Sequence, residues 1–473
     1  MRVPEDPRSA DPIEARRVDS PRRATILVTN RSPTDPHAAD DRATKLPRTV
    51  VLLSWVSFFA DVSGEMVYPL IPMFVVGVLG ASTTKLGAIE GAAQFVVALV
   101  AAWSGWRSDR RRRRTPYVRI GYGLPVLGKS LLALASAWSM VLVGRLADRL
   151  GKGLRGSPRD ALIADEAGPR MRGRAFGFHR AMDTAGALVG VLLAAVLLWW
   201  LTGSPAREGA TTPAPDAGHA FRMVFGISAA LGLISFALTF LVHDRATGAG
   251  DAPETSATSS TSSTSSTSAT SATSATSATS ARRPALPRAY WRAILPLLVF
   301  SLANSSDAFL LLRARDVGLS PWAVVLAYAA FNVTYSALSF PAGLLSDRLG
   351  RWRVIVVGWA IYAAVYVGFA FTGAIGVWPL LALYGVYMAL TDGVGKALVA
   401  DHAPAERRGA AMGIFSMASG LLTLFASLLA GVLWDRFGPS ATFAVGAIAA
   451  VVAIGLVPLA TSGAAPAMED ARR

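Results

Sequence analysis

The amino-acid sequence predicts an all-α integral membrane protein with twelve transmembrane helices, arranged as two pseudo-symmetric six-helix bundles. Of its 473 residues, 52% are hydrophobic and 16% are charged, whereas soluble domains usually carry about 25% charged residues. The charged residues gather between apolar runs of roughly 20 residues, the length at which a helix crosses a bilayer. Only helices and closed barrels hydrogen-bond every backbone group inside lipid, and these runs are too long for barrel strands.

The apolar runs form two sets of six. They begin near Thr49, Leu86, Tyr117, Trp138, Ala175 and Phe221 in the first set, and near Ala293, Pro321, Val354, Val377, Ala410 and Ala441 in the second. Between the sets lies an uncharged run of Ser, Thr and Ala, Thr255 to Ala281, whose composition is typical of a flexible linker. We expect a tail over 1–48, a bundle over 49–244, a linker over 245–289, a bundle over 290–462 and a tail over 463–473.

Basic residues set the expected orientation. The formal net charge is +15, and arginine clusters occur at 107–119, 170–174, 282–288, 348–353 and 407–408. Lysine and arginine are enriched in cytoplasmic loops, so we expect a multi-pass protein of the cell (inner) membrane with both termini and the linker in the cytoplasm. The sequence lacks the basic stretches interleaved with aromatic residues that nucleic-acid grooves need, so the expected partner is the lipid bilayer and not a nucleic acid.

The sequence gives little support for a metal site, a cofactor site, a signal peptide or an ATP-binding loop. The chain has no cysteine and five histidines, none at the spacing of a metal motif, so we predict no resident metal and no cofactor. Residues 1–48 contain no apolar stretch long enough for a signal-peptide core, so the first span is expected to be an uncleaved anchor. The absence of a Gly-x-x-x-x-Gly-Lys loop disfavours transport driven by ATP.

The two halves of the chain share sequence motifs at nearly the same offset. The stretch from Ala161 to Asp165 matches Ala397 to Asp401, and Arg172-Gly173 matches Arg408-Gly409. The motif Gly-x-x-x-Asp-Arg occurs at Gly105, Asp109 and Arg110, and again at Gly343, Asp347 and Arg348. Duplicated halves are typical of secondary transporters, which bind their substrates between the repeats.

This second motif resembles the loop signature of the major facilitator superfamily, and the resemblance covers about residues 49 to 462. The signature continues at Gly350 and Arg351 in the second copy, whereas Arg112 replaces that glycine in the first. Glycine at the helix end allows close packing, the carboxylate can face a helix N-terminus, and arginine can bind acids or lipid phosphates. The resemblance implies a latch that forms in one conformation and breaks in the other. The alternative is ordinary basic loop charge.

Finer motifs give a narrower resemblance. The segments Phe59–Pro69, Gly151–Asp160 and Phe176–Asp183 resemble a bacterial permease branch that includes nickel-resistance-type exporters. The fifth span carries Gly177, Gly186 and Gly190, similar to the family's antiporter motif, although Val191 stands where that motif has proline. Close helix packing explains these glycines equally well.

Charged residues inside the first-half spans are the leading functional candidates. Asp61 and Glu65 share one helix face, and a second stripe consists of Arg145, Asp148, Arg149 and Lys152. The resemblance places both stripes on the central cavity. They are either a structural ion-pair network or a proton-coupling site, for which we prefer Asp61 because Asn304 stands at a matching depth in the second half. Asp183, Arg180 and His179 form a smaller cluster, and Glu90 and Lys129 should each pair with one of these groups.

The second half is less charged. Asn304 and Asp307 lie on the seventh span with Ser305 and Ser306 between them, and Asp392 and Lys396, four residues apart on the tenth, should pair. Such groups suit hydrogen bonding to a small polar or amphipathic solute.

The sequence therefore predicts a secondary transporter that works by alternating access, is coupled to protons and exports a small solute as a monomer. One alternative is a metal-ion exporter of the same fold that uses Asp61, Glu65 and His179. The alternative from another class is a membrane-embedded enzyme, which needs a nucleophile and a base that the sequence motifs do not reveal.

Overall fold

The computed structural model describes residues 46–111, 114–202, 217–243, 286–404 and 408–461, which are almost entirely helical. The first-half elements are α2 (Arg48–Val67) with the short helices η2 (Tyr68–Leu70) and η3 (Met73–Val78), α3 (Thr83–Arg111), α4 (Thr115–Ala133), α5 (Trp138–Thr202), α6 (Ala217–Leu238) and η4 (Thr239–Leu241). The second-half elements are α7 (Arg288–Ala303), α8 (Ala308–Asp316), α9 (Pro321–Leu349), α10 (Arg351–Phe371), α11 (Val377–Asp401), α12 (Arg408–Phe437) and α13 (Pro439–Thr461).

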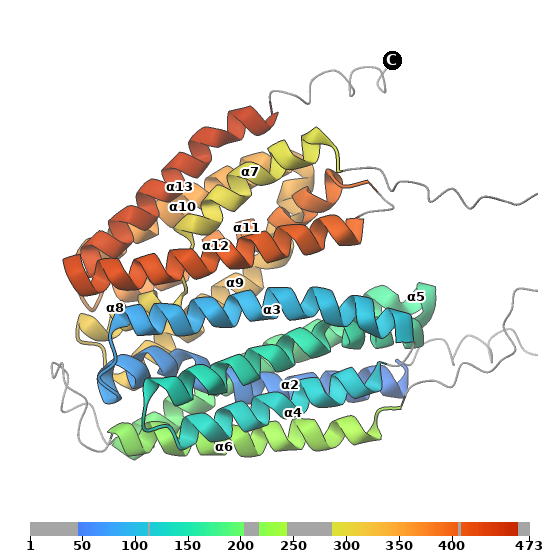
Figure 1. Ribbon diagram of the computed structural model, residues 1–473, viewed down its shortest axis with the longest axis horizontal. Coiled ribbons are helices and arrows are strands. Elements are labelled where there is room, and N and C mark those ends of the chain that lie inside the picture. The colour runs from blue at the N-terminus through green and yellow to red at the C-terminus, as the bar shows by residue number, and fades with distance from the viewer. Residues whose placement is uncertain (1–45, 112–113, 203–216, 244–285, 405–407, 462–473) are drawn as a thin grey trace, which may run out of the picture. The chain divides into compact units, whose positions relative to one another are not determined.

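The helices of the two sequence halves form two groups. In Figure 1, α2 to α6 lie below and α7 to α13 above, with α3 and α12 next to each other where the groups meet. The bounds predicted for the tails and the linker lie largely outside the described residues. The all-α fold class is confirmed.

Helix α5 contains the fourth and fifth predicted spans. The Ser57 hydroxyl lies 3.2 Å from the Arg159 guanidinium and 3.0 Å from the His179 ring, although these two residues are 20 positions apart on α5. A straight helix of that length would separate them by about 30 Å. The chain therefore reverses between Arg159 and His179, which gives a first arm that begins at Trp138 and a second arm that ends at Thr202.

Ten described helical segments are long and apolar enough to cross a membrane, with α7 and α8 counted together. Helix α4 and the first arm of α5 are two further spans, which gives the twelve spans that the sequence predicts. The first arm is too charged to be found by hydropathy, because it carries Arg145, Asp148, Arg149 and Lys152.

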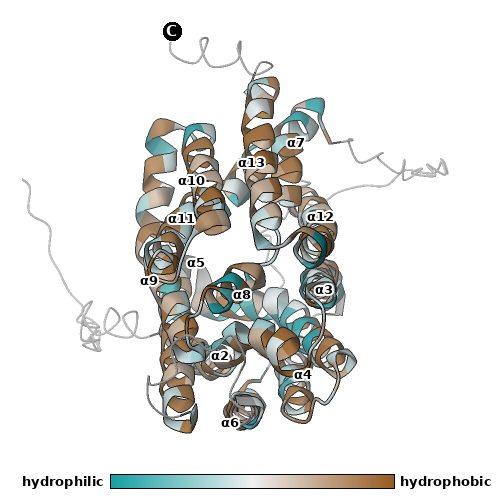
Figure 2. Ribbon diagram, turned by 90° about the vertical axis from the view of Figure 1, so that its left-hand side faces the viewer, coloured by the Kyte–Doolittle hydropathy of each residue, from teal (hydrophilic) through white to brown (hydrophobic). Residues whose placement is uncertain are grey.

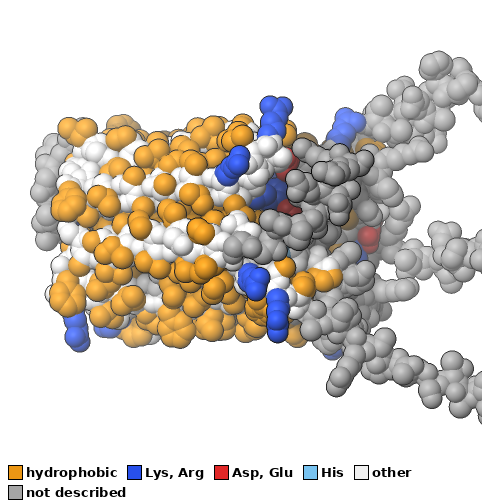
Figure 3. Space-filling model, turned by 90° about the horizontal axis from the view of Figure 1, so that it is seen from above, with side chains coloured by type: hydrophobic (Ala, Val, Ile, Leu, Met, Phe, Trp, Pro, Cys, Tyr) orange, Lys and Arg blue, Asp and Glu red, His pale blue; other side chains and the backbone are white. Residues whose placement is uncertain are grey.

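Apolar side chains dominate the outer surface of the helices. Trp200 is 72% exposed, Phe340 74% and Ile448 62%, which would be costly in water but suits contact with lipid. Figure 2 shows apolar residues on the outer helices α9, α10 and α13, and in Figure 3 they cover the middle of the visible face while basic side chains lie toward its ends. This is the surface of a multi-pass membrane protein.

Glycines bring the second arm of α5 against α2. A Cβ atom on Gly186 would lie 2.5 Å from the carbonyl oxygen of Phe58, and one on Gly190 would lie 2.4 Å from that of Val62. Nothing lies within 4 Å of a Cβ at Gly177. Two of the three glycines of the antiporter-like motif therefore have a direct packing role.

We predict that Gly190→Val lowers the stability of the protein, because the added side chain must push α2 away; overpacking of this kind usually costs about 1–3 kcal/mol. The matched control is Gly177→Ala on the same arm, which has open space and should not lower the unfolding temperature. Thermal unfolding of the purified variants in detergent measures both effects. Equal unfolding temperatures for Gly190→Val and the native protein would contradict the packing account.

Candidate functional site

A buried ion pair joins α3 to the first arm of α5. Arg145 donates to both carboxylate oxygens of Glu90, at 2.9 and 2.7 Å, and the two residues are 3% and 0% exposed. Asp148 lies 3.6 Å from Arg145 and 3.9 Å from Arg149, and the guanidinium of Arg145 also sits 5.5 Å from the Tyr68 ring. This network matches the structural alternative, and the expected pairing of Glu90 with the stripe is confirmed.

Two acids and two lysines near this network make fewer polar contacts than Glu90 and Arg145 do. Asp61 makes no hydrogen bond or ion pair with any residue that the structure describes. Glu65 accepts a 3.3 Å hydrogen bond from the Tyr328 hydroxyl, which belongs to the other half. Lys129 donates to Ser63 at 2.6 Å, so its partner is a hydroxyl and not a member of the charged stripes. Lys152 is exposed, has no ion-pair partner among the described residues, and is a close electrostatic neighbour of Glu65 and Asp61.

A chain of polar contacts runs through Ser57, His179 and Asp183. The Ser57 hydroxyl lies 3.0 Å from His179 Nε2, and His179 Nδ1 lies 3.4 Å from the Asp183 carboxylate. The sequence motifs did not reveal this serine, histidine and acid arrangement, because Ser57 and His179 are on different helices.

This arrangement is not suited to act as a catalytic triad of serine, histidine and acid. Ser57 is 1% exposed and His179 4%, so a substrate cannot reach them, and the Ser57 hydroxyl also bonds Tyr122 at 2.8 Å. Ser57 is in mid-helix, where backbone N–H groups bond within the helix and cannot stabilise an oxyanion.

The seventh span is broken at its polar residues. Helix α7 ends at Ala303, Asn304 leaves the helical conformation with φ −86° and ψ 76°, and α8 begins at Ala308. The Asp307 carboxylate accepts a 2.7 Å hydrogen bond from the Tyr384 hydroxyl. The side-chain oxygen of Asn304 is buried and has no hydrogen-bond partner among the described residues.

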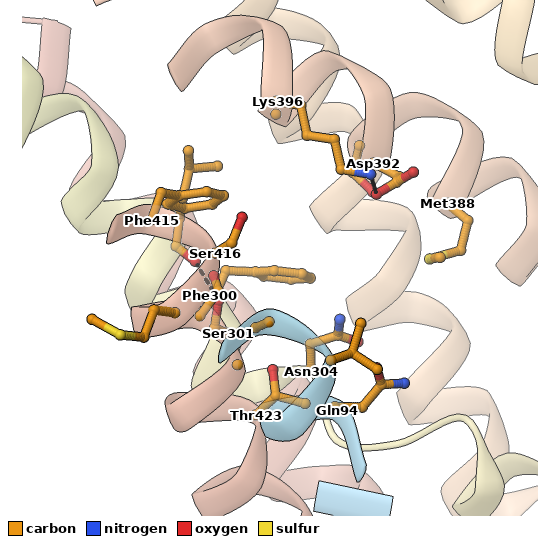
Figure 4. Close-up of a pocket in the computed structure, with 18 of the residues that line it drawn as sticks. Gln94, Phe300, Ser301, Asn304, Met388, Asp392, Lys396, Phe415, Ser416 and Thr423 are labelled. Atoms are coloured by element: carbon orange, nitrogen blue, oxygen red, sulfur yellow. Dashed lines mark hydrogen bonds and ion pairs between the residues drawn. The ribbon is translucent and has the colours of Figure 1, made fainter. Parts of the chain in front are cut away.

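A cavity of about 1350 Å³ adjoins this break (Figure 4). Its lining comes mainly from α7, α11 and α12 and includes the polar residues Gln94, Ser301, Asn304, Ser305, Ser306, Asp307, Thr391, Asp392 and Lys396. The apolar part includes Leu297, Phe300, Trp359, Tyr387, Met388 and Met412. The volume is sufficient for a drug-sized solute.

The charged stripes of the first half do not line this cavity. The residues concerned are Asp61, Glu65, Arg145, Asp148, Arg149, Lys152 and Asp183. The expectation that these stripes face the central cavity is therefore wrong for this cavity, because Arg145 and Asp148 are engaged with groups between the first-half helices. Of the predicted second-half residues, Asn304, Asp307, Asp392 and Lys396 do line it. Lys396 pairs with Asp392 at 2.8 Å, as expected, and Tyr335 donates to the same acid at 2.9 Å.

The second loop signature forms a cluster of polar contacts. Arg351 lies 3.1 Å from Asp347 and forms an ion pair with Asp401 at the end of α11. Gly350 has φ 91°, a conformation that favours glycine and lets the chain turn from α9 into α10. Gly343 has nothing within 4 Å of a Cβ position, so the expectation of close packing there is wrong. Arg348 makes no hydrogen bond or ion pair with another described residue.

The first loop signature is described in part. The backbone of Gly105, Asp109 and Arg110 belongs to α3, but their side chains lie outside the described residues. Arg114 forms an ion pair with Asp165. Asp165 and Asp401 are the matching acids of the internal repeat, so each half pairs a loop arginine with its repeated acid. The sequence comparison detected this repeat but not the partner of its acid.

The halves are joined at the opposite end of α12 by a contact that sequence reasoning missed. Asp435 accepts hydrogen bonds from the backbone N–H groups of Thr83 and Thr84, both at 2.9 Å, at the start of α3. The threonine hydroxyls lie 2.7 and 2.6 Å from the same carboxylate. Gly431 allows this approach, because a Cβ there would lie 2.5 Å from the Thr83 carbonyl oxygen. Asp435 thus caps a helix of the other half.

Comparison with known proteins decides the family. The model of the Major Facilitator Superfamily matches residues 53–391 and 308–471. The chain belongs to the major facilitator superfamily. It is 31% identical over 415 residues to an uncharacterised MFS-type transporter of Methanocaldococcus jannaschii, with 86% of this chain and 94% of the relative covered.

Other matches are more distant. A staphylopine export protein of Staphylococcus aureus is 25% identical over 142 residues, which cover 30% of this chain and 36% of that protein. The crystal structure of the D323A mutant of the nucleoside transporter NupG matches with a TM-score of 0.66 and 12% identity, covering 87% of this chain and all of the other. The chain is therefore a membrane transporter of a small molecule and not an enzyme. The branch of nickel-resistance-type exporters is not shown by these matches.

We predict that Glu90→Ala destabilises the protein by about 3–5 kcal/mol, because the buried Arg145 charge loses both of its hydrogen bonds to a carboxylate and keeps only the more distant Asp148 at 3.6 Å. The double variant Glu90→Leu with Arg145→Met should recover most of this loss, since neither charge then remains. Thermal unfolding in detergent measures both. A double variant no more stable than Glu90→Ala would show that the pair itself, and not the stranded charge, determines stability.

Proposed function

We propose that this transporter is a secondary active, proton-coupled exporter that moves a small polar or amphipathic solute by alternating access. The observation that carries the proposal is a cavity lined from both halves that is sealed toward one end of the helices. At that end Asp435 holds Thr83 and Thr84, and Tyr328 donates to Glu65. Both contacts cross between the halves, so they must break if the cavity is to open on that side.

The other end of the cavity is basic. Asp435 lies near the end of α12, whereas Met412, which lines the cavity, lies near the beginning of this 30-residue helix. The loop arginines Arg114 and Arg351 lie at the same end as Met412. Because lysine and arginine favour cytoplasmic loops, we place this end, both termini and the linker in the cytoplasm of a cell with the transporter in its inner membrane. The conformation described is then open toward the cytoplasm.

Asp61 is the proposed proton-coupling residue. It has no direct partner among the described residues, so a proton can bind it without first breaking a hydrogen bond. It is an electrostatic neighbour of Lys152 and of Glu65, and Glu65 contacts the other half through Tyr328. Protonation of Asp61 therefore changes the electrostatic balance beside a contact that must break during transport.

Export is the proposed direction. The staphylopine export protein is a relative by partial match, and the cavity faces the side from which an exporter takes its solute. Both halves line one cavity in a single chain, so we propose that the monomer transports. The metal-ion alternative receives no support from the geometry: no group of three or more histidine or acidic side chains in the described part of the chain is close enough to bind a metal ion.

We predict that Asp61→Asn abolishes pH-gradient-driven transport and leaves folding intact, because the amide cannot carry the proton and no hydrogen bond is lost. Flux of a solute found by substrate screening, with and without a pH gradient in proteoliposomes, measures the coupling. Solute movement down its own gradient should remain, which also controls for insertion. If the flux through Asp61→Asn depends on the pH gradient as in the native protein, Asp61 is not the proton-coupling residue.

We predict that Asp435→Ala shifts the protein toward a state open at the sealed end. Loss of a helix cap usually costs about 0.5–2 kcal/mol, and 1.4 kcal/mol changes an equilibrium tenfold. The chain has no cysteine, so spin labels on Leu134→Cys and Ile375→Cys, in the two halves, report this opening by electron-electron distance. The control is Asp316→Ala, which breaks an ion pair with Arg313 inside α8.

In the control the distance distribution should match that of the labelled parent protein. A distribution for Asp435→Ala that also matches the parent would show that the cap does not hold the sealed end closed.

A further inference from the structure

The cavity carries one uncompensated charge. Among the described lining residues the charged side chains are Asp307, Asp392 and Lys396. Lys396 neutralises Asp392 at 2.8 Å. Asp307 takes part in no ion pair with a described residue, and its one hydrogen-bond donor is the neutral Tyr384 hydroxyl at 2.7 Å. The formal charge of the lining is therefore −1, and it is located at the break of the seventh span.

The break places further hydrogen-bond acceptors beside Asp307. Asp307 directly precedes α8, whose N-terminal end carries a partial positive charge that stabilises a carboxylate. Helix α7 ends at Ala303 with its carbonyl groups directed toward the same break, and these carry partial negative charge. The buried side-chain oxygen of Asn304 has no partner among the described residues. The Ala303 carbonyl oxygen already accepts from the Tyr362 hydroxyl at 2.6 Å, so the Asn304 oxygen is the acceptor at the break that lacks a donor among the described residues.

Aromatic side chains form part of the surface of the same lining. Phe300 and Trp359 are stacked with ring centroids 4.7 Å apart and an interplanar angle of 10°, and Tyr387 lies 5.9 Å from Phe300. Figure 4 shows Phe300 beside Ser301 at the cavity, with Asn304 nearby. Aromatic faces attract cations as well as apolar groups. An amphipathic cation satisfies both the acceptors and this surface.

We propose that Asp307 and Asn304 form a subsite for the ammonium group of an organic amine, whose apolar body lies against Phe300 and Trp359. The N–H groups of the ammonium donate to the Asp307 carboxylate and to the Asn304 oxygen, and its charge neutralises the cavity. This inference rests on the proposed function, since it takes the cavity to be the place where the transported solute binds.

The test uses three probes of similar size that differ in charge: 2-phenylethylamine, 2-phenylethanol and phenylacetate. Their binding to the purified full-length protein in detergent at pH 7 is measured by isothermal titration calorimetry. The amine should bind at least about tenfold more tightly than the alcohol or the acid anion. Asp307→Asn should reduce this preference to less than about threefold while leaving binding of the alcohol unchanged.

The matched control is Asp316→Asn, an acid outside the cavity lining, which should keep the native preference. Asp307→Glu retains the charge and should also keep the preference for the amine. If Asp307→Asn does not fold, the proposal is tested by Asp307→Glu and by the order in which the native protein binds the three probes. Equal binding of all three probes to the native protein, or an amine preference that survives in Asp307→Asn, would overturn the proposal.

The measurement is made at equilibrium without a proton gradient, so it is independent of coupling. If the native protein transports a solute in response to a pH gradient but does not prefer the amine, the ammonium subsite is refuted and the proposed function is not. Loss of gradient dependence in a protein that prefers the amine would instead refute proton coupling and leave the subsite in place.

Discussion

An ionised group inside the apolar interior of this transporter must either be paired or face water, because an isolated charge there costs several kcal/mol. The structure meets this constraint in two ways. Glu90 and Arg145 neutralise each other with two hydrogen bonds and are almost completely buried. Asp61 and Asp307 lack a basic partner within ion-pair distance among the described residues; Asp61 is half-buried, and Asp307 lines the cavity. The Glu90–Arg145 pair gives the protein a fixed framework, and the acids without a basic partner are the ones to which we assign the binding of a proton or a solute.

The two halves differ in where they hold their charged and polar groups, although they share sequence motifs. The first half holds most of the charge and places it between its own helices, through the pairs around α5. The second half supplies most of the cavity, because its seventh span is broken and its polar groups turn toward the opening. The loop ion pairs Arg114–Asp165 and Arg351–Asp401 remain symmetric. The Asp435 cap joins α12 of the second half to α3 of the first, at the end of α12 opposite to the loop ion pairs.

The sequence predicts the features that depend on composition and short spacing. Apolar runs indicate the fold class and the number of spans, and the spacing of four residues correctly pairs Asp392 with Lys396. The broken seventh span also had a signal, since Asn304, Ser305, Ser306 and Asp307 are poor helix formers in sequence. The same four residues also predict a polar stretch within a continuous span, so the sequence does not distinguish a broken helix from an unbroken one.

Contacts between distant residues could not be predicted in this way. Thr83 and Asp435 are 352 positions apart, and Glu90 and Arg145 are 55 apart, so no spacing rule connects them. The Ser57, His179 and Asp183 chain depends on how α2 packs against the second arm of α5, which the close approach at Gly186 and Gly190 determines. The absence of the first-half charged stripes from the cavity lining is likewise a result of how the helices pack.

The distinction between paired acids and available acids is tested most directly by a parallel amide scan. Each buried acid is replaced by its amide, one at a time, and every variant is measured for its unfolding temperature and for its pH-dependent flux or amine binding. The account predicts two separate groups: Glu90 and Asp148 variants lose stability, whereas Asp61 and Asp307 variants keep it and lose coupling or binding. Variants that lose stability and function together, with no separation between the groups, would contradict it.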